Sequence, residues 1–535
     1  MKKGFVSALH PQIRKYRKSS AEKRRNMKII LKKLSISLFV IALAFLIGCG
    51  SGAVKQARAE VKTAGEWSYN VEADGNATIF AYYGNATDVV IPQEIEGKTV
   101  VGIHTFAFMN RNTLTSVTIP DSVTTIATSA FYRCSSLTSI SLPPNLTTIE
   151  ACTFEGCSSL TSISIPEHVT TIKTRAFDGC SSLTNISLPQ GITAIESATF
   201  ANCSALASIS IPEHVTTIEY IAFGECSSLK NISIPQSVTT IRDSAFEGCS
   251  ALTSISIPQS VTSIGRNPFL RCSNLDSITV ENGNSKYDSR NNCNAILDTA
   301  KNTLITGYRN TIIPENIASI GELAFCGCNS LTSILIPESV TSIEKFAFAG
   351  CSNVESIVIP KNVTSIGEGS FNECSRLKKI IIPESVTRIA ESTSREEGVF
   401  YGCPSGLVIW TTKNSCADKY AKKQGIKVKY MNTSAQAHPS AASMTIKSGL
   451  KLTAGKKKLK LTWKKVSKAS GYEIQISQKK NFKGAKKRFL KSSKKSFTIK
   501  KLKSGAVYYV RIRAYAKADS KKVYGKWVTA KKKVK

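Results

Sequence analysis

The chain has 535 residues and a formal net charge of +35 at pH 7. Its length exceeds what one hydrophobic core usually organises, so we expect two or three folded units after a processed N-terminus. The charge lies at the two ends, since residues 1–33 carry about +11 and residues 435–535 about +29, which leaves about −5 between them. Because counterion release requires clustered Lys and Arg at the contact surface, this near-neutral middle excludes nucleic acid as its partner.

An export segment is predicted at residues 1–59. Basic residues precede an apolar run from Leu34 to Ile47, which is the order found in secretory signals. At about fourteen residues, the run is short for a membrane-spanning helix. The start of the segment stays open between Met1 and Met27, because Met27 begins a signal of more usual length.

Two processing sites compete after the apolar run. Leu46-Ile-Gly-Cys49 resembles a lipobox, in which Cys49 is acylated and becomes the new N-terminus. Ala57-Arg-Ala59 has the small-x-small pattern of ordinary signal peptidase, and an uncleaved anchor is the third alternative. We expect an extracellular chain at the cell surface, and we favour a membrane-anchored lipoprotein over free secretion.

Between residues 108 and 269 the sequence has a strict 23-residue period, and such a period decides the architecture. One repeat, residues 176–195, reads Ala-Phe-Asp-Gly-Cys-Ser-Ser-Leu-Thr-Asn-Ile-Ser-Leu-Pro-Gln-Gly-Ile-Thr-Ala-Ile. Residues 183–188 alternate toward their end as a short strand does, and Pro189 ends that strand because proline cannot donate to a ladder. Residues 192–195 then return along the back of the coil.

A single coil of this kind cannot bury its own apolar edge. Successive coils therefore stack, with parallel strands about 4.8 Å apart. The register resumes after an interruption, at Phe325, Phe348, Phe371 and Phe400. The predicted fold is mainly β: a curved solenoid of 23-residue coils with a parallel sheet, followed by a small β-sandwich.

The repeated pattern is Ala-Phe-x-x-Cys-x-x-Leu-x-x-Ile-x-Ile-Pro-x-x-Val-x-x-Ile, in twelve Phe-marked copies. It closely resembles the BspA-like leucine-rich repeats of bacterial surface proteins, over about residues 80–430. The resemblance implies a leucine-rich-repeat solenoid used for adhesion to proteins or cells, and it implies no catalysis. It also implies an N-terminal coil at 60–107, repeats at 108–403 and a cap at 404–430 that contains a short helix ending before Gly425.

The interruption covers roughly residues 281–311, where the spacing of the Phe ladder lengthens. Asn282-Gly283 is a hairpin-turn signal, and residues 294–298 and 303–307 have the pattern of two short strands. We predict a hairpin that projects from the stack, with an enlarged coil of no separate function as the alternative.

Cysteine is frequent in this chain, with 16 residues, but eleven of them share one repeat position. Neighbours in such a ladder point the same way, which is poor geometry for a disulfide. We expect reduced thiols that behave as small buried hydrophobes. The eleven are Cys134, Cys157, Cys180, Cys203, Cys226, Cys249, Cys272, Cys328, Cys351, Cys374 and Cys403.

Candidate metal and catalytic residues give no coherent site. Cys326-Gly-Cys328 lacks the second half of a zinc site, and His168 and His214 are two coils and about 10 Å apart, which is too far to share an ion. Ser and Thr recur at periodic positions without a base beside them, and no motif of a known catalytic class falls outside the repeat register. We therefore expect no catalytic residues, no cofactor, no metal and no enzymatic activity.

A polar linker at 431–443 precedes a second folded unit at 444–535. Residues 458–463, 471–477 and 508–515 alternate as the strands of a small β-sandwich do.

Trp463, Tyr472 and the run from Leu502 to Arg513 resemble a fibronectin type III domain. The resemblance implies that Trp463 lies in the core and that Leu502 to Tyr508 form the tyrosine corner. We expect Trp527 on the last strand, packed against the opposite sheet.

This unit is strongly basic, because about 28 lysines accompany only Glu473 and Asp519 as acidic residues. Its outward surface must therefore be positive. Either the charges are merely solvated, or the unit is retained on anionic cell-wall polymer or on a membrane surface.

A candidate partner surface lies on the strands after the interruption. In the earlier coils the two outward strand residues are small and polar, whereas the second of them becomes Leu335, Val358 and Ile381 in the later coils, with Lys379 beside the last. An exposed apolar stripe on an exported protein predicts a binding site for a protein or glycan, unless the hairpin or the cap covers it. The alternative function is a structural spacer or a self-associating surface coat. The earlier pairs are Ser139/Ser141, Ser162/Ser164, Asn185/Ser187, Ser208/Ser210, Asn231/Ser233 and Ser254/Ser256.

Overall fold

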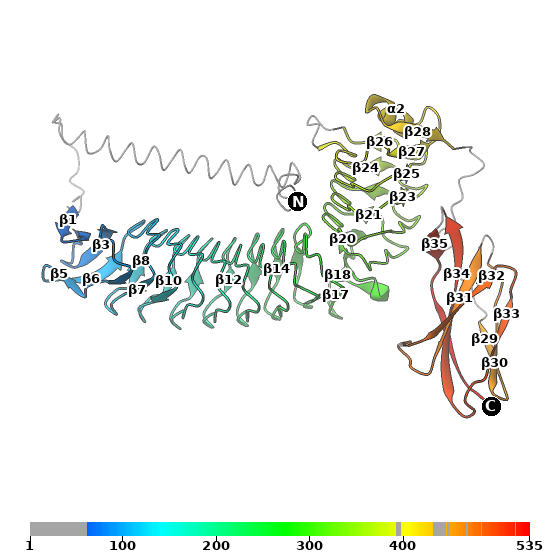
Figure 1. The fold of residues 1–535 in the computed structure, drawn as a ribbon, viewed down its shortest axis with the longest axis horizontal. Helices are drawn as coiled ribbons and strands as arrows, with labels where there is room; N and C mark the ends of the chain where they lie inside the picture. The colour runs from blue at the N-terminus through cyan, green and yellow to red at the C-terminus, as the bar shows by residue number, and fades with distance from the viewer. Residues whose placement is uncertain are drawn as a thin grey trace.

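The computed structural model describes residues 61–391, 397–431, 446, 450–466, 469–482, 484–518 and 521–535. These residues form a row of stacked coils and a C-terminal β-sandwich (Figure 1), so the predicted mainly-β fold class is confirmed. Among them, no helix is long and apolar enough to cross a membrane. The export segment, with Cys49, lies outside the described residues.

The N-terminal coil begins as an antiparallel meander and then joins the stack. Strand β3 (Ala77–Tyr82) pairs in parallel with β6 (Lys98–Ile103), which in turn pairs with β8 (Thr125–Ile126) of the next coil. The meander therefore covers the first open edge of the repeats. The N-terminal coil also contains β1 (Val61–Ala64), β2 (Trp67–Val71), β4 (Asp88–Val90) and β5 (Glu94–Ile95).

Each following coil has a front segment before its proline and a short back strand after it. Back strands pair in parallel with their equivalents in neighbouring coils within two groups, residues 148–172 and residues 194–264, as in Ala194↔Thr217. The front segment at 183–188 keeps Ile186 and Leu188 buried, but it is not part of a ladder, so the predicted strand is present only in other coils. The front strands are β7 (Ser116–Thr118), β9 (Ser139–Ser141), β15 (Ser254–Ile257) and β17 (Ser277–Val280), and the back strands are β10 (Thr148–Ile149), β11 (Thr171–Ile172), β12 (Ala194–Ile195), β13 (Thr217–Ile218), β14 (Thr240–Ile241) and β16 (Ser263–Ile264).

A continuous stack of phenylalanine rings forms the centre of the core. From Phe108 to Phe269 successive ring centroids lie 4.9–5.7 Å apart with nearly parallel planes, and all these rings are fully buried. The Phe register predicted from the repeat is therefore confirmed.

Ten of the eleven ladder cysteines are buried thiols, as predicted, and Cys403 is half-buried. The Cys180 Sγ donates a hydrogen bond to the Phe154 carbonyl of the preceding coil (3.3 Å), and the same contact recurs along the array. Burial raises the pKa of these thiols, to about 12 for Cys134. The neighbouring serines have a similar structural use, since the Ser181 hydroxyl donates to the Ser158 carbonyl one coil earlier (3.3 Å).

The interruption is an enlarged coil and not a projection. Strands β19 (Ala295–Asp298) and β20 (Thr303–Gly307) form the predicted antiparallel hairpin. However, every residue of β19 is buried, because its apolar side chains join the main core, and β20 pairs in parallel with β21 (Ser319–Ile320). The prediction that the hairpin projects from the stack is thus wrong. The segment also contains β18 (Tyr287–Asp288) and the 3₁₀ turn η1 (Arg290–Asn292).

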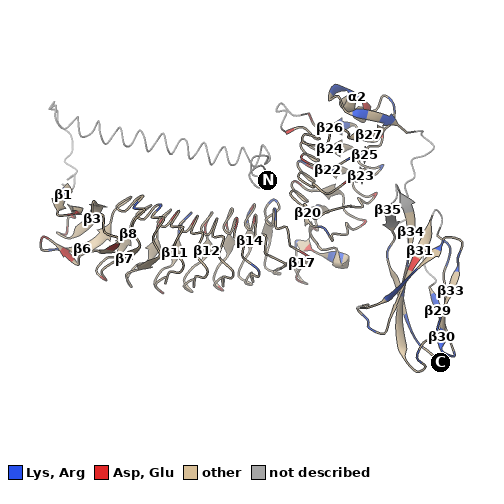
Figure 2. Ribbon diagram, in the orientation of Figure 1, with Lys and Arg blue, Asp and Glu red and all other residues tan. Residues whose placement is uncertain are grey.

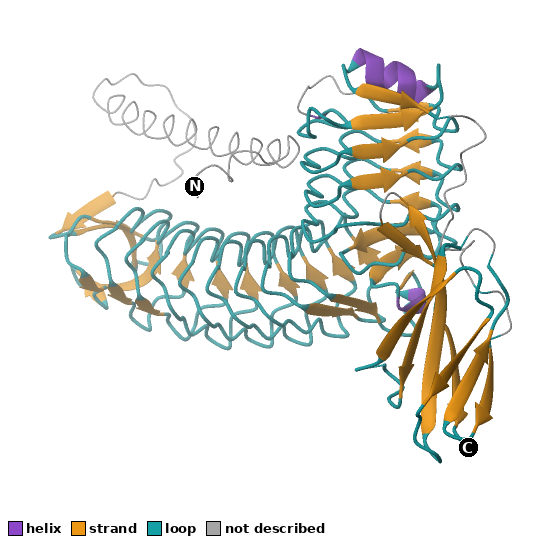
Figure 3. Ribbon diagram, turned by 45° about the vertical axis from the view of Figure 1, so that its right-hand side comes forward, coloured by secondary structure: helices purple, strands orange, loops and turns teal. Residues whose placement is uncertain are grey.

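The row of coils changes direction at this enlarged coil (Figures 1 and 3). The Phe stack is interrupted here, and the Tyr308 hydroxyl donates to the Phe269 carbonyl, the acceptor that a cysteine thiol uses in other coils. The Asn267 side-chain amide also reaches the Leu323 carbonyl (2.8 Å). Hydrogen bonds therefore join the two stacks where ring contacts do not.

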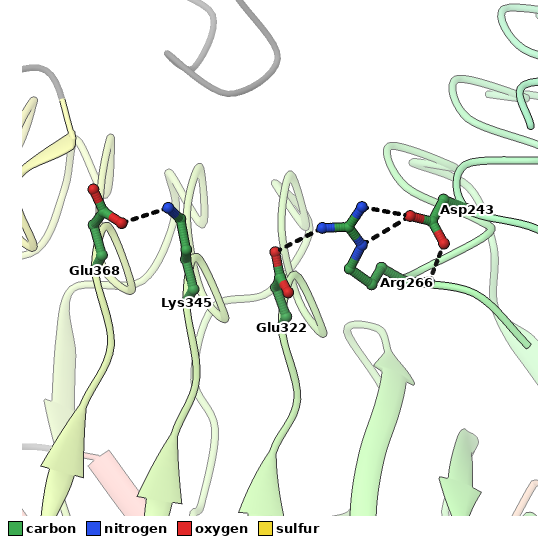
Figure 4. Close-up of polar contacts among 5 residues, drawn as sticks. All are labelled: Asp243, Arg266, Glu322, Lys345 and Glu368. Carbon is green, nitrogen blue, oxygen red and sulfur yellow. Dashed lines mark hydrogen bonds and ion pairs between the residues drawn. The ribbon is translucent and has the colours of Figure 1, made fainter. Parts of the chain in front are cut away.

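Charged side chains follow the same path across the bend (Figure 4). Arg266 lies between Asp243 of the preceding coil (2.7 Å) and Glu322 of the coil after the insertion (3.1 Å). Lys345 and Glu368 pair in the next two coils.

The second stack ends in the predicted helical cap. Helix α2 (Cys416–Lys423) begins after Ser415, whose hydroxyl accepts from the Asp418 amide, and the chain turns away at Gly425 with φ of +67°. The back strands here are β22 (Ser342–Ile343), β24 (Ser365–Ile366) and β26 (Arg388–Ile389), and the front strands are β23 (Ser356–Val358), β25 (Lys379–Ile381), β27 (Val408–Thr411) and β28 (Lys427–Tyr430).

The C-terminal unit is a sandwich of two antiparallel sheets, as expected. Trp463 and Tyr472 are buried between them, and the Lys503 amide donates to the Tyr508 hydroxyl (3.2 Å), which is the predicted tyrosine corner. One sheet contains β29 (Lys451–Gly455), β30 (Lys458–Thr462) and β33 (Ser496–Lys500); the other contains β31 (Gly471–Ser477), β32 (Lys486–Lys491), β34 (Val507–Ala518), β35 (Lys521–Tyr524) and β36 (Val528–Lys533).

Trp527 does not pack against the opposite sheet, so that prediction is wrong. Its ring centroid lies 4.5 Å from the Arg511 guanidinium and 4.3 Å from that of Arg513. Both arginines alternate with the core residues of β34, Val510 and Ile512, and attraction between guanidinium and indole holds the ring on the outer face.

Candidate functional site

The front face of the first stack is smooth and polar. The paired front residues Ser162 and Ser164, Ser208 and Ser210, and their equivalents are exposed, as predicted. Because the side chains at these positions are small and polar, they protrude little from this face and expose little apolar area. This part of the solenoid therefore offers few features by which one ligand could be selected.

The front face of the second stack is different. Leu335 and Val358 are each 39% exposed, as expected for the predicted stripe. Sequence reasoning missed Ile312, which occupies the same position one coil before Leu335 and is 66% exposed. The signal was present, because Ile312-Ile313-Pro314 has the same register as Leu335-Ile336-Pro337. We call Ile312, Leu335 and Val358 the apolar stripe.

Ile381 does not belong to the exposed stripe, and this prediction is wrong. Its side chain is only 7% exposed. In the parallel ladder Ile381 lies between Val358 and Trp410, and the indole is far larger than the serine that neighbours the same position in the early coils. The cap thus covers one end of the stripe and leaves the remainder open.

Positive charge surrounds the covered end. The Lys379 and Lys429 amines lie 4.3 Å and 4.4 Å from the Trp410 ring centroid, within the range of a cation–π contact. Lys427, on the same strand as Lys429, is exposed. Trp410 and these two cap lysines were not predicted, because the cap lies outside the repeat register.

The front surface of the second stack combines aliphatic side chains, one indole and several amines. Within the described residues, no group of three His, Cys, Asp or Glu is placed to hold a metal ion. His168 and His214 are both exposed.

The C-terminal unit forms a second candidate surface. Basic residues recur along its strands and turns (Figure 2). Glu473, its one described acidic residue, is 3% exposed and binds the Arg513 guanidinium (2.7 Å). That carboxylate therefore neutralises a charge within one sheet and not the surrounding lysines.

Comparisons with protein families identify both units. The family described as "BspA type Leucine rich repeat region" matches residues 76–207, 193–301 and 305–415. The family described as "Fibronectin type III domain" matches residues 439–526. No curated protein matches the chain.

Several bacterial repeat proteins are among the solved structures similar to this chain. A leucine rich cell surface protein from Faecalibacterium prausnitzii is 30% identical, over 68% of this chain and 97% of that chain, with a TM-score of 0.49. A leucine-rich repeat protein from Bacteroides ovatus is 27% identical, over 71% and 100% of the two chains, with a TM-score of 0.44. A leucine-rich repeat protein from T. pallidum is 28% identical, over 41% and 91%, with a TM-score of 0.34. The family matches to the repeats cover more than half of the chain, so the chain belongs to the BspA-type leucine-rich-repeat family, and it carries a C-terminal fibronectin type III domain.

Proposed function

We propose that this chain is a surface-exposed binding protein whose solenoid takes a protein partner at the apolar stripe. The observation that supports it is the exposure of Ile312, Leu335 and Val358 in three successive coils, where the coils of the first stack carry mostly serine. Contiguous apolar surface on an exported protein is characteristic of an interaction site, because water otherwise contacts it at a cost.

The charges beside the stripe indicate the chemistry of the partner. Lys379, Lys427 and Lys429 favour a protein segment that carries acidic residues next to aliphatic ones. Trp410 offers an aromatic edge of the kind that is enriched at the centre of protein interfaces. The experiment below distinguishes a protein partner from a glycan ligand.

Retention at the surface is the second part of the proposal. The lipobox-like sequence at Cys49 supports acylation, and the basic fibronectin domain supports contact with an anionic wall polymer or membrane. The two ends of the chain would then hold the solenoid at the cell, with its stripe presented outward.

The decisive experiment replaces the stripe with the residues of the early coils. Binding of the full-length parent to a panel of purified matrix proteins and glycans is measured first. The variant I312S/L335S/V358S should retain the parental melting temperature. Its affinity for the proteins that the parent selects should fall at least about tenfold, since each change removes exposed apolar contact area. V90S is the matched control, because Val90 is 71% exposed and precedes an Ile-Pro pair in the first coil. I381S should instead lower the melting temperature, since Ile381 is buried.

Unchanged binding by the triple variant would place the site elsewhere on the chain. If the parent binds only glycans in the panel, the ligand of the apolar stripe is a glycan and not a protein. A parent that binds nothing in the panel but self-associates in sedimentation would support the alternative function, a structural spacer or self-associating coat.

A further inference from the structure

One end of the fibronectin type III domain gathers lysines from three segments of the chain. The Lys457 amide donates to the Lys535 carbonyl (3.0 Å), and the Leu502 amide donates to the Lys457 carbonyl (3.0 Å). Lys458 of β30 is the direct cross-strand partner of Lys500 in β33. The β29–β30 turn, the turn after β33 and the segment after β36 therefore meet at this end.

We call the exposed lysines of this end the basic pole. Backbone contacts place them together, although they come from positions up to about 80 residues apart. The basic pole consists of Lys456, Lys457, Lys458, Lys500, Lys501 and Lys535, all of them exposed.

Without a ligand, the arrangement of lysines in the basic pole lowers the stability of the domain. Like charges directly opposite on neighbouring strands destabilise a sheet, and Lys458 and Lys500 have this relation. Lys457 and Lys501 have φ of +50° and +61°, a conformation that glycine adopts with less strain. Glu473 offers no compensation, because it is bound to Arg513 on the other sheet. A ligand that neutralises the lysines would offset these costs.

We infer that the basic pole binds a linear phosphodiester polymer outside the cell, and this inference rests on the proposed retention at an anionic surface. Lysine is a flexible point charge that binds phosphate without a fixed geometry, whereas bidentate recognition of a planar carboxylate, or of a single phosphate held in one orientation, is matched better by arginine. None of the three segments that meet at the pole, residues 455–458, 499–502 and 533–535, contains an arginine.

The distribution of the lysines favours a polymer over a bilayer. Lys458 and Lys500 lie on one sheet, whereas Lys535 follows β36 of the other sheet, so the charges run around the end of the sandwich. A flat bilayer meets one side of such an end, but a flexible chain of phosphates can follow it. The polymer also contacts more lysines at once, and each contact releases counterions.

The test compares two charge-matched variants of the full chain. In the pole variant, the six lysines of the basic pole become glutamine. In the control variant, six exposed lysines on or beside β32 become glutamine: K479Q, K480Q, K486Q, K487Q, K491Q and K494Q. Binding to immobilised poly(glycerol phosphate) and to phosphatidylglycerol vesicles is measured over a series of salt concentrations.

We expect the pole variant to bind poly(glycerol phosphate) at least about tenfold more weakly than the parent, with a flatter salt dependence, and the control variant to lose less than about threefold. Should the pole variant melt at a lower temperature than the parent, K458Q/K500Q is used in its place and should lose at least about threefold.

If the two variants lose the same amount of affinity for poly(glycerol phosphate), the basic pole is not the binding site, and the polymer is held by the diffuse positive charge of the domain. Stronger binding of the parent to vesicles than to the polymer would overturn the polymer as the ligand class. A parent that binds neither probe would overturn the proposed retention itself. Binding of the partner at the apolar stripe is measured separately and would be unaffected by any of these results.

Discussion

Phe200 shows how one residue holds its coil between two others. Its ring stacks between Phe177 and Phe223, with centroid distances of 5.7 and 5.6 Å, and the side chain is fully buried. We predict that Phe200→Ala lowers the free energy of unfolding by about 3–5 kcal/mol, because it removes buried area and leaves a cavity. Chemical denaturation followed by circular dichroism measures the change. Ser208→Ala, on the exposed front face, is the control and should change it by less than about 0.5 kcal/mol; an unchanged curve for Phe200→Ala would refute the assigned register.

Gly179 has a different role, because its backbone is in the left-handed region with φ of +79°. A Cβ at this position would meet only the Gly156 backbone, at the ordinary distance of 3.5 Å. Gly179→Ala should therefore destabilise the chain by about 1 kcal/mol through backbone strain alone. Gly406→Ala is the comparison, since Gly406 lacks a positive φ and has open space at its Cβ. Equal melting temperatures for the two variants would show that conformation at Gly179 carries no cost.

The residues predicted correctly are those that every coil repeats. Within each uniform stack the Phe rings and the Cys thiols have the same neighbours from coil to coil, so the period alone fixes their burial. Ile381 could not be placed in this way, because its exposure depends on Trp410, a residue of the cap that has no counterpart in the early coils. Trp527 was misplaced for a similar reason, since its position depends on two arginines that are distant in the sequence.

At the scale of one element, the C-terminal cap depends on a buried carboxylate. Asp418 of α2 accepts hydrogen bonds from the Asn414 amide (2.8 Å), the Lys422 amine (3.0 Å) and the Tyr430 hydroxyl (3.2 Å). Burial alone would raise the pKa of Asp418, but these hydrogen bonds outweigh it and the pKa is lowered. The carboxylate thus joins the helix to strand β28.

This shift predicts how the stability of the cap depends on pH. Because the folded pKa is below the unfolded value of about 3.9, the stabilisation is complete above that value and is lost as the pH falls through the folded pKa. Asp418→Asn should therefore lower the melting temperature at pH 7, and its difference from the parent should shrink below about pH 4. Glu391→Gln, which removes an exposed ion pair with Lys423, is the control. A difference that is constant from pH 7 to pH 3 would contradict the assigned role.

The helix and the hairpin show what sequence patterns determine about an element. The helix of the cap was expected from the family resemblance together with Gly425 at its end, and a terminal glycine acts locally. The two strands of the hairpin were also predicted, but their burial was not. Turn and strand signals specify pairing, whereas the apolar contacts that draw β19 into the core involve residues of the neighbouring coils.

At the scale of the whole molecule, the contacts that join neighbouring coils at the bend differ from those within either stack. We predict that Tyr308→Phe costs about 1–3 kcal/mol, because it removes the hydroxyl that donates to the buried Phe269 carbonyl. The loss should fall on the coupling between the stacks, so the thermal unfolding transition should broaden toward two steps. Differential scanning calorimetry of the parent and the variant measures this. Tyr401→Phe, at an exposed tyrosine of the second stack, is the control, and a single sharp transition in both variants would show that the hydroxyl does not couple the stacks.

The constant 23-residue repeat of the first stack has a consequence for how the coding sequence can change in length. Every coil between Phe108 and Phe269 donates and accepts the same contacts through residues at equivalent positions of its neighbours. Loss or gain of one repeat of coding sequence by unequal recombination would remove or add one whole coil and restore every ring and thiol contact at the new junction. The same event across the enlarged coil would separate Tyr308 from Phe269 and Arg266 from Glu322. The first stack can therefore vary in length among relatives by whole coils, while the bend must be inherited as a unit.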